Sequence, residues 1–269
     1  MKATEKTKMP TENKRSFQLD FCLFGVPFQI QPFFWLAAIL FSPFIQREFS
    51  DLRFLSCQLA GWLAAWFLTF AVHELGHALV IKKLFGGKPL IVLYGLGGVT
   101  IHQPVYRRRP GYWGHVLISF AGPAAVLSVI GVLIGAFALR GGEIALLPAS
   151  FIGPIPIPVP WPRLGPLHPE LLEAASNAFL FGFLWMGIVW SALNLLPIHP
   201  LDGGQIARYL LMKVHPRGGL RFSLILSIAC AAAFILLAVT SGDYFISIFF
   251  GFFAMRNFSE LKSLDARWG

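Results

Sequence analysis

The chain has 269 residues, of which 56% are apolar and only 13% are charged, and its mean hydropathy is +0.65. A soluble domain carries about 25% charged residues, so most of this surface does not face water and an ordinary soluble enzyme is excluded. The 27 Phe and 8 Trp exclude a disordered chain, because disordered segments contain few aromatic residues. The composition therefore indicates a polytopic membrane protein.

The net charge of +9, from 22 Lys and Arg against 13 Asp and Glu, does not indicate a nucleic-acid partner. The basic residues lie at the edges of apolar runs, and the preference of Lys and Arg for cytoplasmic loops explains them there. The three cysteines have no metal-ligand spacing, so we interpret them as small apolar residues.

Charged residues delimit six apolar segments, which are candidates for transmembrane helices because crossing the hydrocarbon takes about 20 residues. In chain order they are Phe33–Ile45, Phe54–Ile81, Tyr112–Leu139, Ala174–Leu196, Phe222–Thr240 and Tyr244–Met255. Before the first, Phe21–Gln31 alternates in polarity and contains Gly25 and Pro27, which favours a short hairpin or interfacial strand. The sixth segment has only 12 residues, so it is short enough to be re-entrant.

Two loops have an unusual composition. Residues 90–101, LIVLYGLGGVTI, form a β-prone run with glycines, and we expect a short membrane-associated β element there. Residues 154–162, PIPIPVPWP, cannot form a helix and are expected to be an extended stiff spacer, with a ligand site as the alternative. The predicted fold class is thus an all-α polytopic membrane protein with about six transmembrane helices and a short membrane-associated β element after the second.

The distribution of Lys and Arg predicts the orientation. Six crossings place 18 of these residues on the side of the N-terminus and 4 on the other side. Both termini are therefore expected in the cytoplasm, as in a multi-pass protein of the cell membrane. If the sixth segment does not cross, the split is 15 against 7 and still favours a cytoplasmic N-terminus. The expected organisation is a cytoplasmic tail over residues 1–20, a membrane domain over 21–258 and a C-terminal tail over 259–269.

Residues 73–77, His-Glu-Leu-Gly-His, lie inside the second apolar segment. Residues four apart share a helix face, so His73 and His77 can bind one metal ion while Glu74 takes a proton from metal-bound water. Roughly 0.005 matches to this pattern are expected by chance in a chain with 7 His. Three ionisable groups are costly in a membrane helix and indicate a shared metal ion, with a buried structural cluster as the alternative.

A catalytic zinc site normally has a third protein ligand and keeps one position for water. Asp202 is the only carboxylate between Glu173 and Arg208. His77 lies five residues before the basic end of its segment, and Asp202 lies six before Arg208. In the six-crossing topology both motifs therefore fall at one depth near the cytoplasmic face. Asp202 is a feasible third ligand, and a turn-forming Asp-Gly-Gly is the alternative.

Two further motifs accompany residues 73–77: Ala121-Gly122-Pro123 in the third segment, and the run from Asn194 to Gly204 that ends in Leu-Asp-Gly-Gly. Together these motifs resemble those of the site-2 protease family of intramembrane zinc metalloproteases, over roughly residues 21–210. The resemblance implies a zinc endopeptidase that cleaves a single-pass membrane protein within the bilayer, near the cytoplasmic face. Val126 and His199 depart from the family pattern outside the implied ligand set, and His199 is a candidate donor to a metal ligand or a candidate competitor of Asp202.

The resemblance also implies roles for single residues. The residues implied to bind one Zn²⁺ per chain are His73, His77 and Asp202, and the implied catalytic base is Glu74. The residues implied to hold the substrate backbone are Asn194, Gly97 and Gly98, the two glycines lying in a strand that pairs with the unwound substrate.

A non-proteolytic membrane zinc protein, such as a transporter or a scaffold, is the alternative function. A transporter would have ionisable residues along a path across the membrane, whereas the fifth and sixth segments contain none within the uncharged spans given above. A di-iron membrane hydroxylase would need more clustered histidines than these two. Proteolysis is therefore the function that the sequence predicts.

Overall fold

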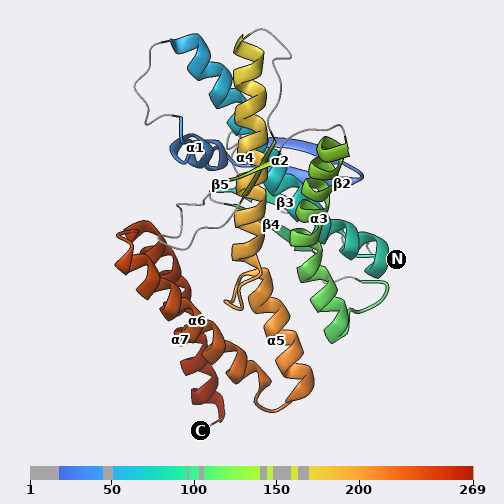
Figure 1. Ribbon diagram of the computed structural model, residues 1–269. Coiled ribbons are helices and arrows are strands. Elements are labelled where there is room, and N and C mark those ends of the chain that lie inside the picture. Colours follow the sequence, from blue (N-terminus) through green and yellow to red (C-terminus); the bar gives the residue numbers. More distant parts are fainter. Residues whose placement is uncertain are drawn as a thin grey trace, which may run out of the picture.

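The structure is a computed structural model that describes residues 18–44, 51–95, 97–102, 106–139, 144–147, 159–162 and 170–268. The helices in these ranges are α1 (Pro32–Leu40), α2 (Leu52–Phe85), α3 (Tyr112–Leu139), α4 (Glu170–Asn194), α5 (Asp202–Val214), α6 (Gly219–Thr240) and α7 (Tyr244–Trp268) (Figure 1). The strands are β1 (Leu19–Leu23), β2 (Val26–Ile30), β3 (Pro89–Tyr94), β4 (Gly97–His102), β5 (Ile144–Leu147) and β6 (Val159–Pro162).

Among the described residues, four helices are long and apolar enough to cross a membrane, namely α2, α3, α4 and α6. The first predicted span, residues 33–45, overlaps the helix α1, whose 9 residues are too few to cross the hydrocarbon. The last, residues 244–255, is the apolar beginning of α7, which continues through a charged half to Trp268. The predicted helical membrane fold is confirmed, whereas the count of six crossings stays a prediction.

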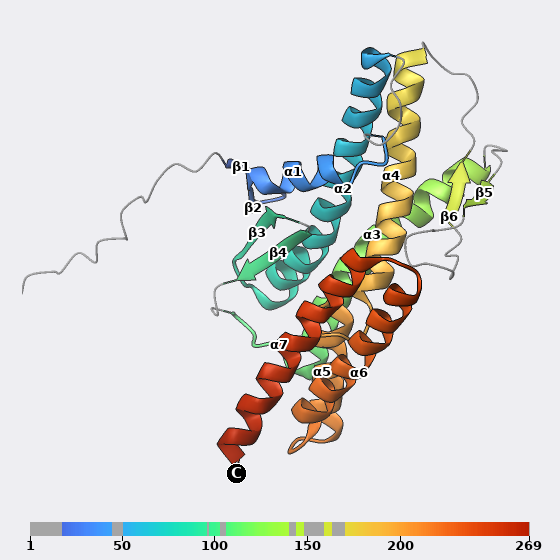
Figure 2. The same cartoon turned by 90° about the vertical axis from the view of Figure 1, so that its left-hand side faces the viewer.

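A four-stranded sheet lies beside the second half of α2 (Figure 2). β1 and β2 form an antiparallel hairpin over the residues where the sequence favoured one, β3 runs parallel to β2, and β4 runs antiparallel to β3. The strand order is β1-β2-β3-β4, so within the described residues β4 is an edge strand. The glycine-containing run 90–101 thus forms the two strands nearest to the histidine motif.

The connection between α3 and α4 contains a second, two-stranded sheet. β5 pairs antiparallel with β6, and Val159 lies opposite Leu147. β6 forms the end of the proline-rich run 154–162, so this end is extended but paired with another strand. Residues 154–158 of the predicted spacer lie outside the described residues.

α2 is at the centre of the fold and packs closely against α4 and α3. Close approach depends on glycine: a Cβ on Gly61 would lie 3.0 Å from the backbone N of Phe179 on α4. A Cβ on Gly76 would likewise lie 2.9 Å from the carbonyl carbon of Ala121 on α3. These contacts fix the height of α2, and therefore of the histidine motif, relative to its two neighbours.

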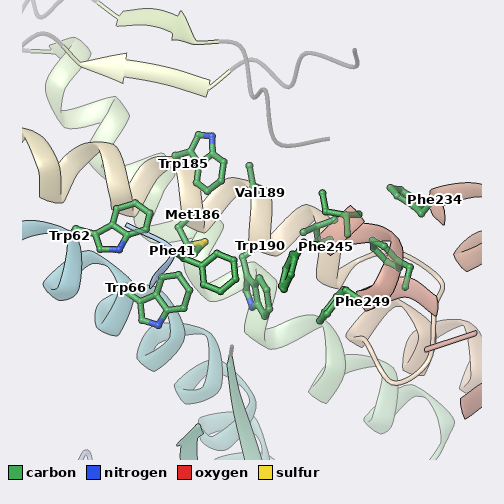
Figure 3. Close-up of a pocket in the computed structure, with 13 residues that line it drawn as sticks. Phe41, Trp62, Trp66, Trp185, Met186, Val189, Trp190, Phe234, Phe245 and Phe249 are labelled. Carbon is green, nitrogen blue, oxygen red and sulfur yellow. The ribbon is translucent and has the colours of Figure 1, made fainter. Parts of the chain in front are cut away.

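α6 and α7 pack on each other, and α6 packs on α5. Between this helix pair and the pair α2 and α4 lies an apolar cavity of about 170 Å³, lined mainly by aromatic side chains (Figure 3). Trp190 on α4 lines the cavity and also contacts β4, since a Cβ on Gly97 would lie 3.4 Å from its ring. The C-terminal helices α6 and α7 contact the rest of the fold mainly through α5 and the loop before it.

Candidate metal centre

Three ionisable side chains from two helices converge beside α3. His73 and His77 lie one turn apart on α2, and Asp202 is the first residue of α5. The Nε2 atoms of the two histidines are 3.2 Å apart. Oδ2 of Asp202 lies 3.1 Å from Nε2 of His73 and 3.4 Å from Nε2 of His77. The structure thus brings together the three side chains that the sequence predicted as ligands.

The separations of these three atoms fit one tetrahedral metal ion. With bonds of about 2.0–2.1 Å, two ligands of a tetrahedral zinc ion lie about 3.3–3.4 Å apart. The two histidines and one carboxylate are also a donor set that zinc prefers, and three protein ligands leave the fourth position open. The cluster of His73, His77 and Asp202 therefore has the atoms and the spacing to hold a zinc ion.

The hydrogen bonds around the cluster also favour a cation. Nδ1 of His77 lies 2.6 Å from the carbonyl oxygen of Ile118, and since a carbonyl oxygen can only accept, Nδ1 carries the proton of this hydrogen bond. In a neutral His77, the lone pair on Nε2 then faces the carboxylate of Asp202. Oδ2 of Asp202 is buried and accepts no hydrogen bond from the described part of the chain. A bound cation removes this repulsion, so the residues present fit the metal ion.

The motif Ala121-Gly122-Pro123 on α3 forms the wall against which the two histidines pack. A Cβ on Gly122 would lie 2.9 Å from Nε2 of His73 and 2.6 Å from Cε1 of His77. Only glycine leaves room for both rings. One turn earlier on the same helix, the carbonyl of Ile118 orients the ring of His77, as the partners of metal-binding histidines commonly do. Sequence reasoning missed Ile118, because its contribution comes from the backbone.

Glu74 is buried on α2 beneath strand β4. Its Oε2 accepts a hydrogen bond of 2.7 Å from Oγ1 of Thr100. A Cβ on Gly98 would lie 2.6 Å from Cγ of Glu74, so the strand passes directly over the carboxylate. Sequence reasoning identified Glu74 and Gly98 but not Thr100, whose signal was only its place in the same β-prone run.

Asn194 and Gly97, two residues predicted to bind substrate backbone, both lie near Trp190. Nδ2 of Asn194 donates to the carbonyl oxygen of Trp190 at 3.1 Å, one helical turn earlier, and the Asn194 side chain is mostly buried. Gly97 lies over the Trp190 ring, as described above. Substrate binding by these residues and by Gly98 stays a prediction.

The Leu-Asp-Gly-Gly motif starts α5 against the loop that precedes it. A Cβ on Gly203 would overlap the carbonyl group of Leu195, and a Cβ on Gly204 would overlap the backbone of Ile198 and His199. The two glycines therefore let the first turn of α5 pack closely on this loop, and Asp-Gly-Gly is the start of a helix, not the separate turn of the alternative interpretation. The same turn directs the carboxylate of Asp202 at the histidines.

His199 interacts with α5 and α7, and it is not part of the group that can hold a metal ion among the described residues. Its Nε2 lies 3.5 Å from Nη1 of Arg208 and 4.0 Å from Oε2 of Glu260. Burial and the positive charge of Arg208 lower the pKa of His199 to about 4, so its ring is neutral at neutral pH. The interpretation of His199 as a competitor of Asp202 finds no support in this arrangement.

The chain is similar to known proteases. It is 24% identical over 147 residues to a zinc metalloprotease of Methanocaldococcus jannaschii, and this match covers 55% of the chain and 33% of that protein's length. Its fold is similar to that of the site-2 protease from Methanocaldococcus jannaschii, with a TM-score of 0.50 and 20% identity, covering 91% of this chain and 95% of the other. The model of peptidase family M50 matches residues 62–239. Because that match covers more than half of the chain, the resemblance to the site-2 protease family is confirmed and the chain belongs to peptidase family M50.

Proposed function

We propose that this integral membrane protein is a zinc endopeptidase that hydrolyses a peptide bond of a transmembrane substrate. The observation that carries the proposal is the approach of two imidazole nitrogens and one carboxylate oxygen to within 3.1–3.4 Å of one another, one residue away from a buried glutamate. Membership of family M50 and the long apolar helices support a protease that acts in the bilayer. The proposal assigns to the protein the endopeptidase activity that its sequence motifs imply.

His73, His77 and Asp202 would hold one zinc ion per chain. When bound, zinc polarises a carbonyl group and lowers the pKa of its bound water to about 7. Glu74 accepts the proton of the attacking water and returns it to the leaving amine nitrogen. The hydrogen bond from Thr100 holds Oε2 of Glu74 in place and leaves Oε1 for the water. Ile118 keeps His77 in the tautomer that directs a lone pair at the ion.

The substrate would be a single-pass membrane protein whose helix unwinds at the cleavage site. The backbone carbonyls of a helix are already hydrogen bonded, so the scissile bond becomes accessible only in an extended segment. β4 is an edge strand, and it passes over Glu74 at Gly98. An extended substrate that pairs with this edge would lie beside the base, and Gly97 and Asn194 would help to hold its backbone.

Cleavage would occur near the cytoplasmic face. Lys82 and Lys83 lie in the last turn of α2, five and six residues after His77, so the candidate metal site is close to the basic end of this helix. Basic residues accumulate on the cytoplasmic side of membrane proteins, which favours this orientation and a cytoplasmic N-terminus.

The experiment compares wild type with Glu74→Gln in lipid nanodiscs, measuring zinc content and cleavage of a transmembrane peptide. We expect equal zinc content and loss of cleavage in the variant, because the amide cannot accept the proton. A folded wild type without zinc, or undiminished cleavage by Glu74→Gln, contradicts the proposal. Zinc without cleavage of any transmembrane substrate would favour the transporter or scaffold alternative. The same variant, incubated with membranes and analysed by mass spectrometry, would capture the natural substrate.

A further inference from the structure

The loop at residues 195–201, which ends at the ligand residue Asp202, is held by side chains of both C-terminal helices. The backbone N–H of His199 donates to Oγ of Ser227 on α6 at 3.0 Å. The backbone carbonyl of His199 accepts a hydrogen bond of 2.6 Å from Nδ2 of Asn257 on α7. Ser227 is 1% exposed and Asn257 is 0% exposed. Two successive peptide units of the loop are thus bonded to α6 and α7 in a buried place.

Each of the two side chains is in turn fixed to its own helix. The hydroxyl of Ser227 donates to the carbonyl of Ser223 at 2.8 Å, and the amide of Asn257 also donates to the carbonyl of Phe253 at 2.7 Å. The backbone groups of His199 would be unpaired and buried without them, which costs free energy comparable to a lost hydrogen bond. The position of the loop therefore follows the positions of α6 and α7.

An ion pair connects the C-terminal helix α7 with α5. Arg208 on α5 pairs with Glu260 on α7, which follows Asn257 by three residues and so lies on the same face of that helix. The side chains of Arg208 and Glu260 are 16% and 34% exposed, so this pair is only partly screened by solvent. One face of α7 thereby contacts both α5 and the loop that precedes it.

We propose that Ser227 and Asn257 are positioning residues for the metal centre. They fix His199, and Asp202 follows it after only Pro200 and Leu201, at the start of a helix whose first glycines pack against that same loop. A functional metal ligand must be held within about 0.5 Å of its working position. The inference rests on the proposed function, because it takes zinc as the ion that Asp202 binds.

The test compares Ser227→Ala with Ser223→Ala, one turn earlier on α6. Ser223 is 3% exposed, and among the described residues its hydroxyl donates to the carbonyl of Leu220 on its own helix, at 2.7 Å. Both variants lose one buried hydroxyl from the same helix, but in the described part of the chain the hydroxyl of Ser227 is hydrogen bonded to the loop and that of Ser223 is not. Zinc affinity is measured by competition with a chelating dye, and the ligand geometry by the visible spectrum of the Co²⁺-substituted protein.

We expect Ser227→Ala to bind zinc about tenfold more weakly, the loss typical of residues that orient metal ligands, and to change the Co²⁺ spectrum. Ser223→Ala should match wild type in both, and Ser227→Thr, which keeps the hydroxyl, should recover most of the affinity. Asn257→Asp keeps the size of the side chain but removes the N–H donor, so it should weaken zinc binding at least as much.

Equal zinc affinity and equal Co²⁺ spectra in Ser227→Ala and Ser223→Ala overturn the inference, whether or not Asn257→Asp folds. The positioning role and the proposed function can fail separately. If wild type is folded but binds no zinc, both fail. If wild type binds zinc but Glu74→Gln still cleaves, only the proposed function fails, and the order of the zinc affinities still decides the positioning role.

Discussion

Replacing Gly122 by Ala tests the packing of α3 against the metal cluster. The added methyl carbon would lie 2.9 Å from Nε2 of His73 and 2.6 Å from Cε1 of His77, whereas ordinary contacts begin at 3.4 Å. The rings must therefore move by at least about 0.5–0.8 Å, and Nε2 of His77, the atom nearest to the added carbon, must move further; this exceeds the variation of about 0.2 Å expected in metal–ligand distances. Overpacking of this kind costs about 1–3 kcal/mol.

That cost falls on the zinc-bound state, because the rings can rotate away from the methyl group only when no ion holds them. At 1.4 kcal/mol per tenfold change, zinc affinity should decrease about 5- to 150-fold in Gly122→Ala. Competition with a chelating dye in detergent or nanodiscs measures this change. Gly131→Ala on the same helix is the control, because a Cβ there meets nothing within 4 Å. Equal zinc affinity in the two variants would refute the packing that we describe.

Three further predictions concern the residues around the cluster. Thr100→Val should lower the cleavage rate about tenfold at unchanged zinc content, since it removes the hydrogen bond to Glu74. Thr100→Ser keeps the hydroxyl and should preserve the rate. Equal cleavage rates for wild type and both variants would exclude a role for this bond. Val99→Pro should reduce cleavage far more than zinc content, because proline perturbs the edge strand β4. Val99 is a better position for this substitution than Leu93, which is fully buried in β3. Cleavage equal to that of wild type would count against strand addition by the substrate. Gly61→Ala should lower the free energy of unfolding by about 1–3 kcal/mol, because its Cβ would overlap the backbone of α4; an unchanged denaturation midpoint would contradict this.

The candidate metal site of His73, His77 and Asp202 was largely predictable because its residues follow local rules. The spacing of His73 and His77 places both on one helix face whatever surrounds the helix. Asp202 stood out because it is an isolated carboxylate in a long uncharged region, and costly groups in a membrane need a partner. The glycine-containing run 90–101 also carried the pattern of its strands.

The remaining features depend on contacts between distant segments. The absence of charges predicts one span over residues 33–45, but α1 ends at Leu40, and Ser42 and Pro43 follow it. The partners of the site, such as the carbonyl of Ile118 and the hydroxyl of Thr100, are common groups with no motif of their own. Their roles follow from the packing of α3 and β4 against α2, which no local pattern encodes.

The most direct test of the account is the coordination of the metal in the purified protein. Metal analysis combined with X-ray absorption at the zinc edge should find about one zinc per chain, bound by two imidazoles and oxygen ligands at about 2.0–2.2 Å. His73→Ala and Asp202→Ala should each lose this signal, whereas Glu74→Gln should keep it. A folded wild type without zinc, or a zinc signal that persists in both His73→Ala and Asp202→Ala, would contradict the central claim.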